Sequence, residues 1–300
     1  LGVYNVAVGV NALLTQNFTT STFSYNTAVG TDAGKSVTTG TQNTYIGGLA
    51  GDAATASVEN VAVGYQALSA DTLGSKSVAV GRMALLSQNQ TTATDVYNVA
   101  VGHNAGQQVT TGVHNTLIGG LTGDAITEGA RNTAVGTFAL TADTLGSRNA
   151  ALGYSALGTQ NFTTATDSYN TAVGYEAGGA VTTGIRNTIV GGLAADSVTT
   201  GQYNSVLGFG ALTAETSGSA STAVGYLALS TQNTESTNYN TAVGYEAGKS
   251  VTTGTVNTLI GGLAGDALTT GDSNVVLGYN ALSADTKGAR SVAIGRDALK

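Results

Sequence analysis

Short aliphatic runs return at a nearly fixed distance along the chain, each between a polar residue and a glycine. Residues 60–68 show the pattern: Asn60 precedes Val-Ala-Val, Gly64 follows the run, and Ala67 comes three residues later. Seventeen copies of this motif lie between Asn5 and Leu299, most of them 17 residues apart. Self-similarity at a fixed period predicts a solenoid, in which each repeat forms one coil that stacks on the next.

The motif predicts a short strand that ends in a forced bend. Counting the asparagine as position 0, position 3 is Val, Ile or Leu in all 17 copies, and position 4 is always Gly. Branched aliphatic side chains favour the pleated conformation. A glycine directly after the strand indicates either a positive φ or a close backbone neighbour. The second half of each coil, as in Ala67–Gly74, is expected to supply a second short strand.

The two faces of the predicted strand differ in side-chain size. Positions 1 and 3 share one face, and position 2, which is Ala in 11 of 17 copies, points to the other. We expect neither face to be fully solvated, which is typical of strands in a buried parallel stack. A single thin coil buries too little apolar surface to offset the cost of ordering its backbone, which is ~1–2 kcal/mol per residue. We therefore expect an obligate oligomer, a homotrimer around the long axis, with the small alanine side chains facing that axis.

The polar residue at position 0 is Asn in 14 of the 17 copies and Ser in the others. It is either a ligand contact or a structural residue, in a turn or in a ladder of stacked amides that hydrogen-bond to one another. Its presence at nearly every strand entrance favours the structural role. The motif residues for which we expect structural roles are, in the copy quoted above, Asn60, Val63, Gly64 and Ala67.

A second period groups the coils in fours. The spacings run 21, 17, 17 and 17 residues, so that units of 72 residues begin near positions 5, 77, 149 and 221; the last long spacing is 19. We expect residues 1–300 to form a single β-solenoid repeat domain. The long coils carry polar insertions at 15–24, 87–96, 159–168 and 230–238. Insertions in a solenoid form surface loops, often on the binding face.

The insertions hold the candidate contact residues. Their phenylalanines either bind a partner or pin the loop, and we favour pins because a loop commonly packs on its own side chains. The candidate surface-contact residues are Asn17, Phe18, Phe23, Gln90, Asp95, Asn161, Phe162, Asp167 and Glu235.

The amino-acid composition argues against several classes of function. The net charge is −7 and no basic stripe occurs, which argues against binding to nucleic acid or to an anionic membrane surface. No apolar run approaches the ~20 residues of a membrane span. Cysteine is absent, so disulfides and thiolate metal sites are excluded. The chain starts at Leu1 and its last coil ends at Lys300 without a polar cap, so we expect a segment of a longer protein.

No catalytic residue, cofactor site or metal site is predicted. His103 and His114 recur in no other copy, whereas a reactive site needs convergent partners. Two acidic positions recur once per 72-residue unit, and we expect solvated turn carboxylates there; a calcium site on a three-fold axis is the alternative. These positions are Asp52, Asp124, Asp196 and Asp266, and Asp71, Asp143, Glu215 and Asp285.

A tyrosine follows the motif glycine in six coils. Such a stripe either stacks on sugars or packs at a subunit edge, and we favour edge packing. The six residues are Tyr65, Tyr154, Tyr175, Tyr226, Tyr245 and Tyr279.

The run Asn60–Leu68, with its 17-residue period over residues 5–299, resembles the repeats of phage tail-fibre-like proteins. More distantly it is similar to the head repeats of YadA-like trimeric autotransporter adhesins, whose coils are shorter. The resemblance implies a left-handed parallel β-roll of about 17 coils, wound as a homotrimer in an extracellular fibre. It also implies adhesion to a cell-surface glycan or protein receptor.

Three functions compete. The leading expectation is a structural and adhesive fibre shaft on a virion or a bacterial surface. The alternative is a single-chain β-solenoid that binds ice or glycans. Ice binding is indicated by Thr-Thr pairs such as Thr38-Thr39, although these pairs do not occur in every coil. A carbohydrate-active enzyme would need paired carboxylates ~5–10 Å apart in a cleft that breaks the repeat. The repeat is unbroken, so we expect no enzyme.

Overall fold

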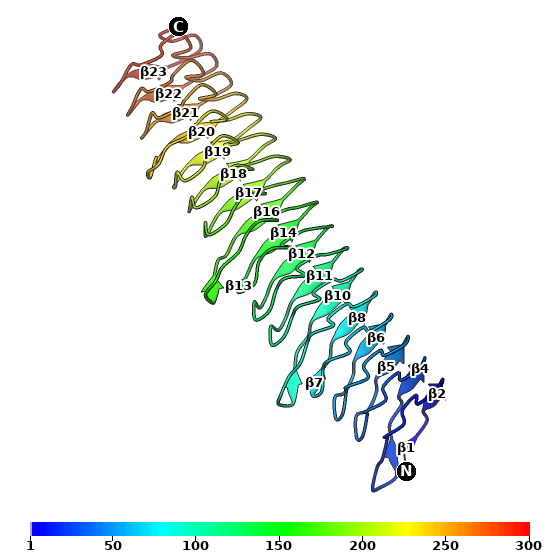
Figure 1. Ribbon diagram of the computed structural model, residues 1–300. Helices are drawn as coiled ribbons and strands as arrows, with labels where there is room; N and C mark the ends of the chain where they lie inside the picture. The colour runs from blue at the N-terminus through cyan, green and yellow to red at the C-terminus, as the bar shows by residue number, and fades with distance from the viewer. Residues whose placement is uncertain (1) are drawn as a thin grey trace. The chain divides into compact units, whose positions relative to one another are not determined.

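The structure, a computed structural model, describes residues 2–300 (Figure 1). Contacts divide the chain into two compact units, and each is described by itself. The first comprises the chain up to Arg148 together with Phe162–Asp167, and the second comprises Asn149–Asn161 and Ser168–Lys300. The division after Arg148 coincides with the start of the third 72-residue repeat unit. None of residues 2–300 belongs to a helix long and apolar enough to cross a membrane.

Each coil contributes one three-residue strand to a parallel sheet. In the first unit these strands are β2 (Val6–Val8), β4 (Thr27–Val29), β5 (Thr44–Ile46), β6 (Val61–Val63), β8 (Val78–Val80), β10 (Val99–Val101), β11 (Thr116–Ile118) and β12 (Thr133–Val135). In the second unit they are β14 (Ala150–Leu152), β16 (Thr171–Val173), β17 (Thr188–Val190), β18 (Ser205–Leu207), β19 (Thr222–Val224), β20 (Thr241–Val243), β21 (Thr258–Ile260), β22 (Val275–Leu277) and β23 (Val292–Ile294).

Neighbouring strands of this sheet pair in register, position by position. Val61 of β6 faces Val78 of β8, and Val275 of β22 faces Val292 of β23. The parallel β-solenoid of about 17 turns predicted from the repeat is therefore confirmed.

The predicted second strand in each coil is wrong. Instead, positions 6 and 8 have positive φ in every coil, as at Gln66 (56°) and Leu68 (53°). A left-handed residue at every second position interrupts the extended backbone, so this half of the coil is a series of tight turns. Its backbone still bonds to the next coil: Leu68 N donates to Ala84 O over 3.0 Å.

Two-residue strands occur only beside insertions within residues 2–300. They form the pairs β1 (Gly2–Val3) with β3 (Thr22–Phe23), β7 (Gly74–Ser75) with β9 (Thr94–Asp95), and β13 (Gly146–Ser147) with β15 (Thr166–Asp167). In Figure 1, β1, β7 and β13 lie on the side of the first unit opposite its long sheet. At the fourth insertion a single bridge joins Ser219 to Thr237.

The side chains at position 2 face the interior of the coil, which corrects our expectation that the alanine face is external. Ala62 and Tyr45, for example, are fully buried within their own unit. The interior is narrow, and larger residues at position 2 fit because position 8 is then often Gly. A Cβ on Gly34 would lie 2.8 Å from the Tyr45 ring, and one on Gly51 would overlap it. Alanine therefore sets the thickness of the coil, not the approach of another chain.

The motif glycine meets both conditions predicted for it. Gly47 has a φ of +131°, and a Cβ at this residue would lie 2.5 Å from the carbonyl oxygen of Gly64 in the next coil. A side chain at position 4 would therefore separate the coils.

The asparagine at position 0 forms a ladder, as predicted, but its side-chain oxygen mostly accepts from the backbone N–H of the next coil; amide-to-amide bonds such as Asn43 Nδ2 to Asn26 Oδ1 (3.2 Å) are the exception. Asn60 N donates to Asn43 Oδ1 (3.0 Å), and Asn60 Oδ1 accepts from Ser77 N (2.8 Å). Asn60 Nδ2 also donates to the carbonyl of Gly74 across its own coil (2.8 Å). The side chain thus satisfies buried backbone groups in two coils, which supports the structural role.

Candidate contact surface

Three of the candidate contact residues are buried, so their side chains do not lie on the surface. Phe18 and Phe162 are 7% and 6% exposed and pin their loops, as favoured from the sequence. Gln90 is also buried, and its backbone N–H donates to the carboxylate of Asp71 in the preceding coil (3.2 Å). For these three residues the contact assignment is corrected.

Phe23 is not a pin. It is 63% exposed, and its ring stacks on Tyr4 with 5.5 Å between centroids. Tyr4 in turn stacks on Tyr25 at 5.4 Å. Phe23 of the first insertion thus joins Tyr4 and Tyr25 in a cluster of three solvent-exposed rings.

The remaining candidates are exposed: Asn17, Asp95, Asn161, Asp167 and Glu235. Two of them also join their insertions to the preceding coil. Asp95 Oδ2 accepts from Lys76 Nζ at 2.6 Å, and Asp167 Oδ1 accepts from Arg148 Nε at 2.8 Å. The hydrogen bond to Asp95 raises the pKa of Lys76 above its ordinary value.

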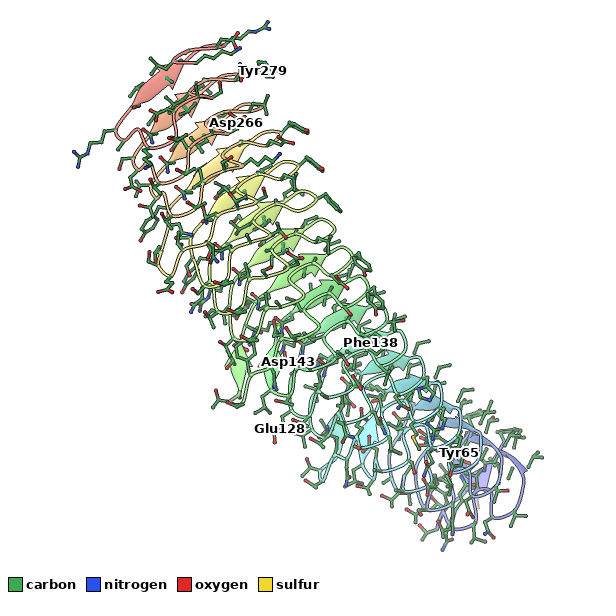
Figure 2. All side chains as sticks on the ribbon, turned by 45° about the horizontal axis from the view of Figure 1, so that its top comes forward. Tyr65, Glu128, Phe138, Asp143, Asp266 and Tyr279 are labelled. Atoms are coloured by element: carbon green, nitrogen blue, oxygen red, sulfur yellow. The ribbon has the colours of Figure 1, made fainter. Side chains whose placement is uncertain are left out.

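The prediction of solvated turn carboxylates is wrong for Asp71, Asp143 and Glu215, which are almost completely buried. Each accepts the backbone N–H of the glycine three residues later, as Asp71 does from Gly74 (2.9 Å). Asp71 also accepts from Gln88 Nε2 in the insertion of the next coil. In Figure 2, Asp143 lies within its coil, whereas Glu128 lies on an exposed turn.

Glu215 shows how such a carboxylate anchors an insertion. It accepts hydrogen bonds from Gln232 Nε2 (3.0 Å), Thr234 N (3.2 Å) and Asn238 Nδ2 (3.1 Å), all in the segment 230–238. This many hydrogen bonds to one carboxylate offset the free energy that a buried charge loses when it leaves water. The carboxylates are therefore structural anchors of the loops.

A sequence signal for these anchors existed but was missed. Asp71 and Gln88 both occupy position 11 of adjacent coils, and other coils carry apolar residues there, such as Val37 and Ile126. Val37 and Ile126 are fully buried. Position 11 is apolar in half of the coils, and those apolar side chains are buried, which marks it as an interior position, so an acid there required a buried partner.

The other acidic series lies half-buried at the turn. Thr141 Oγ1 donates to Asp124 Oδ1 in the preceding coil (2.5 Å), and Ser69 donates likewise to Asp52. Burial raises the pKa of Asp266, whose Oδ1 lacks a hydrogen-bond partner. Within residues 2–300, no group of three or more His, Asp or Glu side chains is placed to hold a metal ion.

The histidines do not converge. His103 Nε2 lies 3.2 Å from Arg82 Nη1, whereas the His114 ring stacks on Tyr97 with 5.7 Å between centroids. Both side chains are exposed, and they belong to different repeat positions.

Position 3 forms a partly exposed apolar ridge along the outer face of each unit. Ile46 is 38% exposed in the first unit, and Leu207 and Leu277 are 50% and 46% exposed in the second. The stripe of tyrosines at position 5 is exposed as well, as Figure 2 shows for Tyr65 and Tyr279. An extended exposed apolar surface of this kind is unusual on a monomer.

Rings within the position 5 stripe stack on each other. The centroids of Tyr226 and Tyr245 are 5.4 Å apart, and those of Tyr154 and Tyr175 are 5.5 Å apart.

No known protein family, curated protein or solved structure matches this chain.

Proposed function

We propose that this chain forms the shaft of an extracellular adhesive fibre, on a phage virion or a bacterial surface, and that it has no enzymatic role. Three copies associate as left-handed β-rolls through their outer ridges. The exposed residues of the insertions contact the receptor.

The exposed ridge at position 3 carries this proposal. Its aliphatic residues recur in every coil and lie outside a core that position 2 already fills. Burying the ridge between copies removes apolar surface from water at ~25 cal/mol per Å². The buried carboxylates support a non-enzymatic role, because their oxygens serve the structure; Glu215 Oε1, for example, accepts from Gly218 N at 2.8 Å.

Lysine substitutions on the ridge test the assembly. Ile260→Lys and Leu277→Lys place charges on outward-facing positions of β21 and β22, so each coil stays folded while association weakens. We expect β-type circular dichroism to persist and the mass by light scattering to fall to one chain. Ser273→Lys, an exposed change off the ridge, is the control. An unchanged mass in both ridge variants would exclude the ridge as the interface.

Adhesion is tested with intact bacterial cells. We expect the labelled chain to be retained on cells of a susceptible strain. A variant with alanine at Asn17, Asn161, Asp167 and Glu235 should be retained at least severalfold less. Equal retention would show that the insertions do not make the contact.

A further inference from the structure

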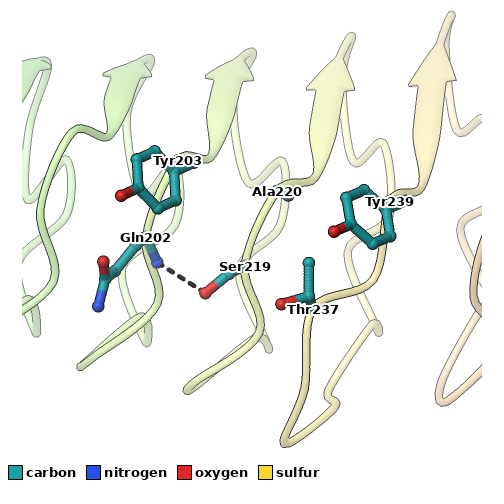
Figure 3. A pocket seen from close by; sticks show the side chains of 6 residues that line it. All are labelled: Gln202, Tyr203, Ser219, Ala220, Thr237 and Tyr239. Atoms are coloured by element: carbon teal, nitrogen blue, oxygen red, sulfur yellow. Dashed lines mark hydrogen bonds between the residues drawn. The ribbon is translucent and has the colours of Figure 1, made fainter.

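A pocket of about 460 Å³ opens beside the fourth insertion (Figure 3). It lies in the second unit, beside the segments that lead into strands β18, β19 and β20, and none of its lining residues belongs to the outer ridge. Two exposed tyrosine rings bound it, and Ala220 lies between them. Its lining residues are Gln202, Tyr203, Ser219, Ala220, Thr237 and Tyr239. We call it the Ala220 slot.

The Ala220 slot is a departure from the repeat. In the other three repeat units, the residue before position 0 of the long coil contacts a residue of the insertion. The contacts are the Tyr4–Phe23 stack, the Lys76–Asp95 ion pair and the Arg148–Asp167 ion pair. In the fourth unit the corresponding residues are Ala220 and Thr237, whose side chains are too small to fill the space.

The space left is one ring thick. Rings in adjacent coils of this protein stack with centroids 5.4 Å apart, as in Tyr4–Tyr25. Tyr203 and Tyr239 are two coils apart, and two steps of ~4.8 Å leave room for one further ring between them. A larger residue at this repeat position covers the neighbouring ring. Arg186, one coil before Tyr203, places its guanidinium over the Tyr203 ring, 5.6 Å from its centroid.

The chemistry of the slot is neutral, with apolar faces and a polar edge. None of its six lining residues is charged. Ser219 Oγ accepts from Gln202 N (3.0 Å), which leaves its hydroxyl hydrogen for a guest. The Gln202 amide and the Thr237 hydroxyl also line the edge, where they offer both donors and acceptors.

We propose that the Ala220 slot binds the pyranose ring of a neutral carbohydrate between Tyr203 and Tyr239. The C–H faces of a pyranose stack on the two rings, and its rim of hydroxyls reaches the amide and hydroxyls of the lining. A bare aromatic guest would leave those polar groups without a partner, and a guanidinium guest, which offers donors only, would leave the Ser219 hydroxyl hydrogen without an acceptor. This inference rests on the adhesive role proposed above and names one ligand class for it.

The substitution Ala220→Tyr closes the slot without straining the backbone. Ala220 has a φ of 59°, and tyrosine already occupies this repeat position with the same sign of φ at Tyr203 (59°) and Tyr239 (50°). Ser273→Tyr places the same ring at the same repeat position three coils later, where φ is also 59°, and is the matched control.

Saturation-transfer NMR on the intact chain measures the binding. The probes are methyl pyranosides of neutral hexoses and N-acetylhexosamines. We expect at least one to bind through its C–H protons, with a dissociation constant that rises at least tenfold in Ala220→Tyr and stays unchanged in Ser273→Tyr. Absence of binding by every pyranoside, or equal binding by Ala220→Tyr, would overturn the proposal. Binding of phenol or methylguanidinium in the slot with no pyranoside bound would do the same.

The mass of the unsubstituted chain and of Ala220→Tyr separates this proposal from the fibre proposal. A trimer that binds no pyranoside would remove the slot and leave the fibre in place. A single chain would remove the fibre, whatever the slot binds.

Discussion

At the scale of single residues, this fold depends on polar groups that join one coil to the next. The Asn115 side chain accepts from the backbone N–H of Asn132 at 3.0 Å and donates to the carbonyl of Gly129 at 2.9 Å. The same arrangement recurs along each unit, so that the amide ladder runs parallel to the strand ladder. A coil therefore recognises its neighbour through a buried side chain as well as through its strand.

Replacement of Asn115 by alanine tests this ladder. The change leaves the buried Asn132 N–H and the Gly129 carbonyl without these partners, and each such group costs ~1–3 kcal/mol. We expect the free energy of unfolding of the first unit to fall by about 2–4 kcal/mol, measured by urea denaturation. Asn17→Ala, at an exposed residue, should change it by no more than ~0.5 kcal/mol. Equal losses in the two variants would contradict the ladder's role.

The pH dependence of stability follows from Tyr45. Burial raises the pKa of its hydroxyl to about 12, from about 10 in the unfolded chain. Since the neutral form is favoured in the fold, its stabilisation is complete below pH 10 and is lost as pH rises from about 10 to 12. The loss is about 2–3 kcal/mol. Tyr45→Phe has no hydroxyl to ionise, so its urea midpoint should fall less between pH 9 and 11.5 than that of the unsubstituted chain. Equal falls of the two midpoints would refute the role of Tyr45.

At the scale of the coil, close stacking depends on the motif glycine. Gly47 combines a left-handed φ with a carbonyl 2.5 Å from where its Cβ would be. Gly47→Ala should therefore cost about 3 kcal/mol or more, through backbone strain and separation of β5 from β6. Gly120→Ala, where a Cβ meets no atom within 4 Å, should be almost neutral. Thermal unfolding of both variants tests this, and similar midpoints would contradict it.

The insertions depend on the buried carboxylate of the preceding coil. Glu215→Ala removes the acceptor for Gln232, Thr234 and Asn238, so segment 230–238 should detach. We expect limited proteolysis to cleave this segment at least tenfold faster than in the unsubstituted chain. Glu235→Ala, at an exposed residue of the same segment, should leave the rate unchanged. If both variants are cleaved alike, Glu215 is not the anchor.

These elements also show what sequence reasoning reaches. The strands, the bend at Gly64 and the amide ladder at Asn60 were predictable, because each follows from residue type and period. Which face of the strand is internal was not, since alternation tells which residues share a face and not which face is buried. The burial of Asp71 required comparison of position 11 across coils. The Ala220 slot was not anticipated, because it depends on small residues from two segments meeting in space.

At the scale of the whole molecule, the outer ridge is the feature on which the proposed association of copies depends. A fully self-contained solenoid has no need of aliphatic residues on its outer face, yet position 3 is Val, Ile or Leu in every coil. These side chains remain partly exposed within their own unit, as at Leu152 (38%) and Ile260 (37%). In the fibre that we propose, association of copies along the ridge covers these side chains.

Sedimentation equilibrium of the unsubstituted chain tests this central claim most directly. The chain mass is 29.7 kDa, and the account predicts a single species of three times that mass at micromolar concentration. Such a mass would support the ridge as the surface on which copies meet. A stable folded species with the mass of one chain would contradict the trimeric fibre and leave a single-chain solenoid with an exposed apolar face.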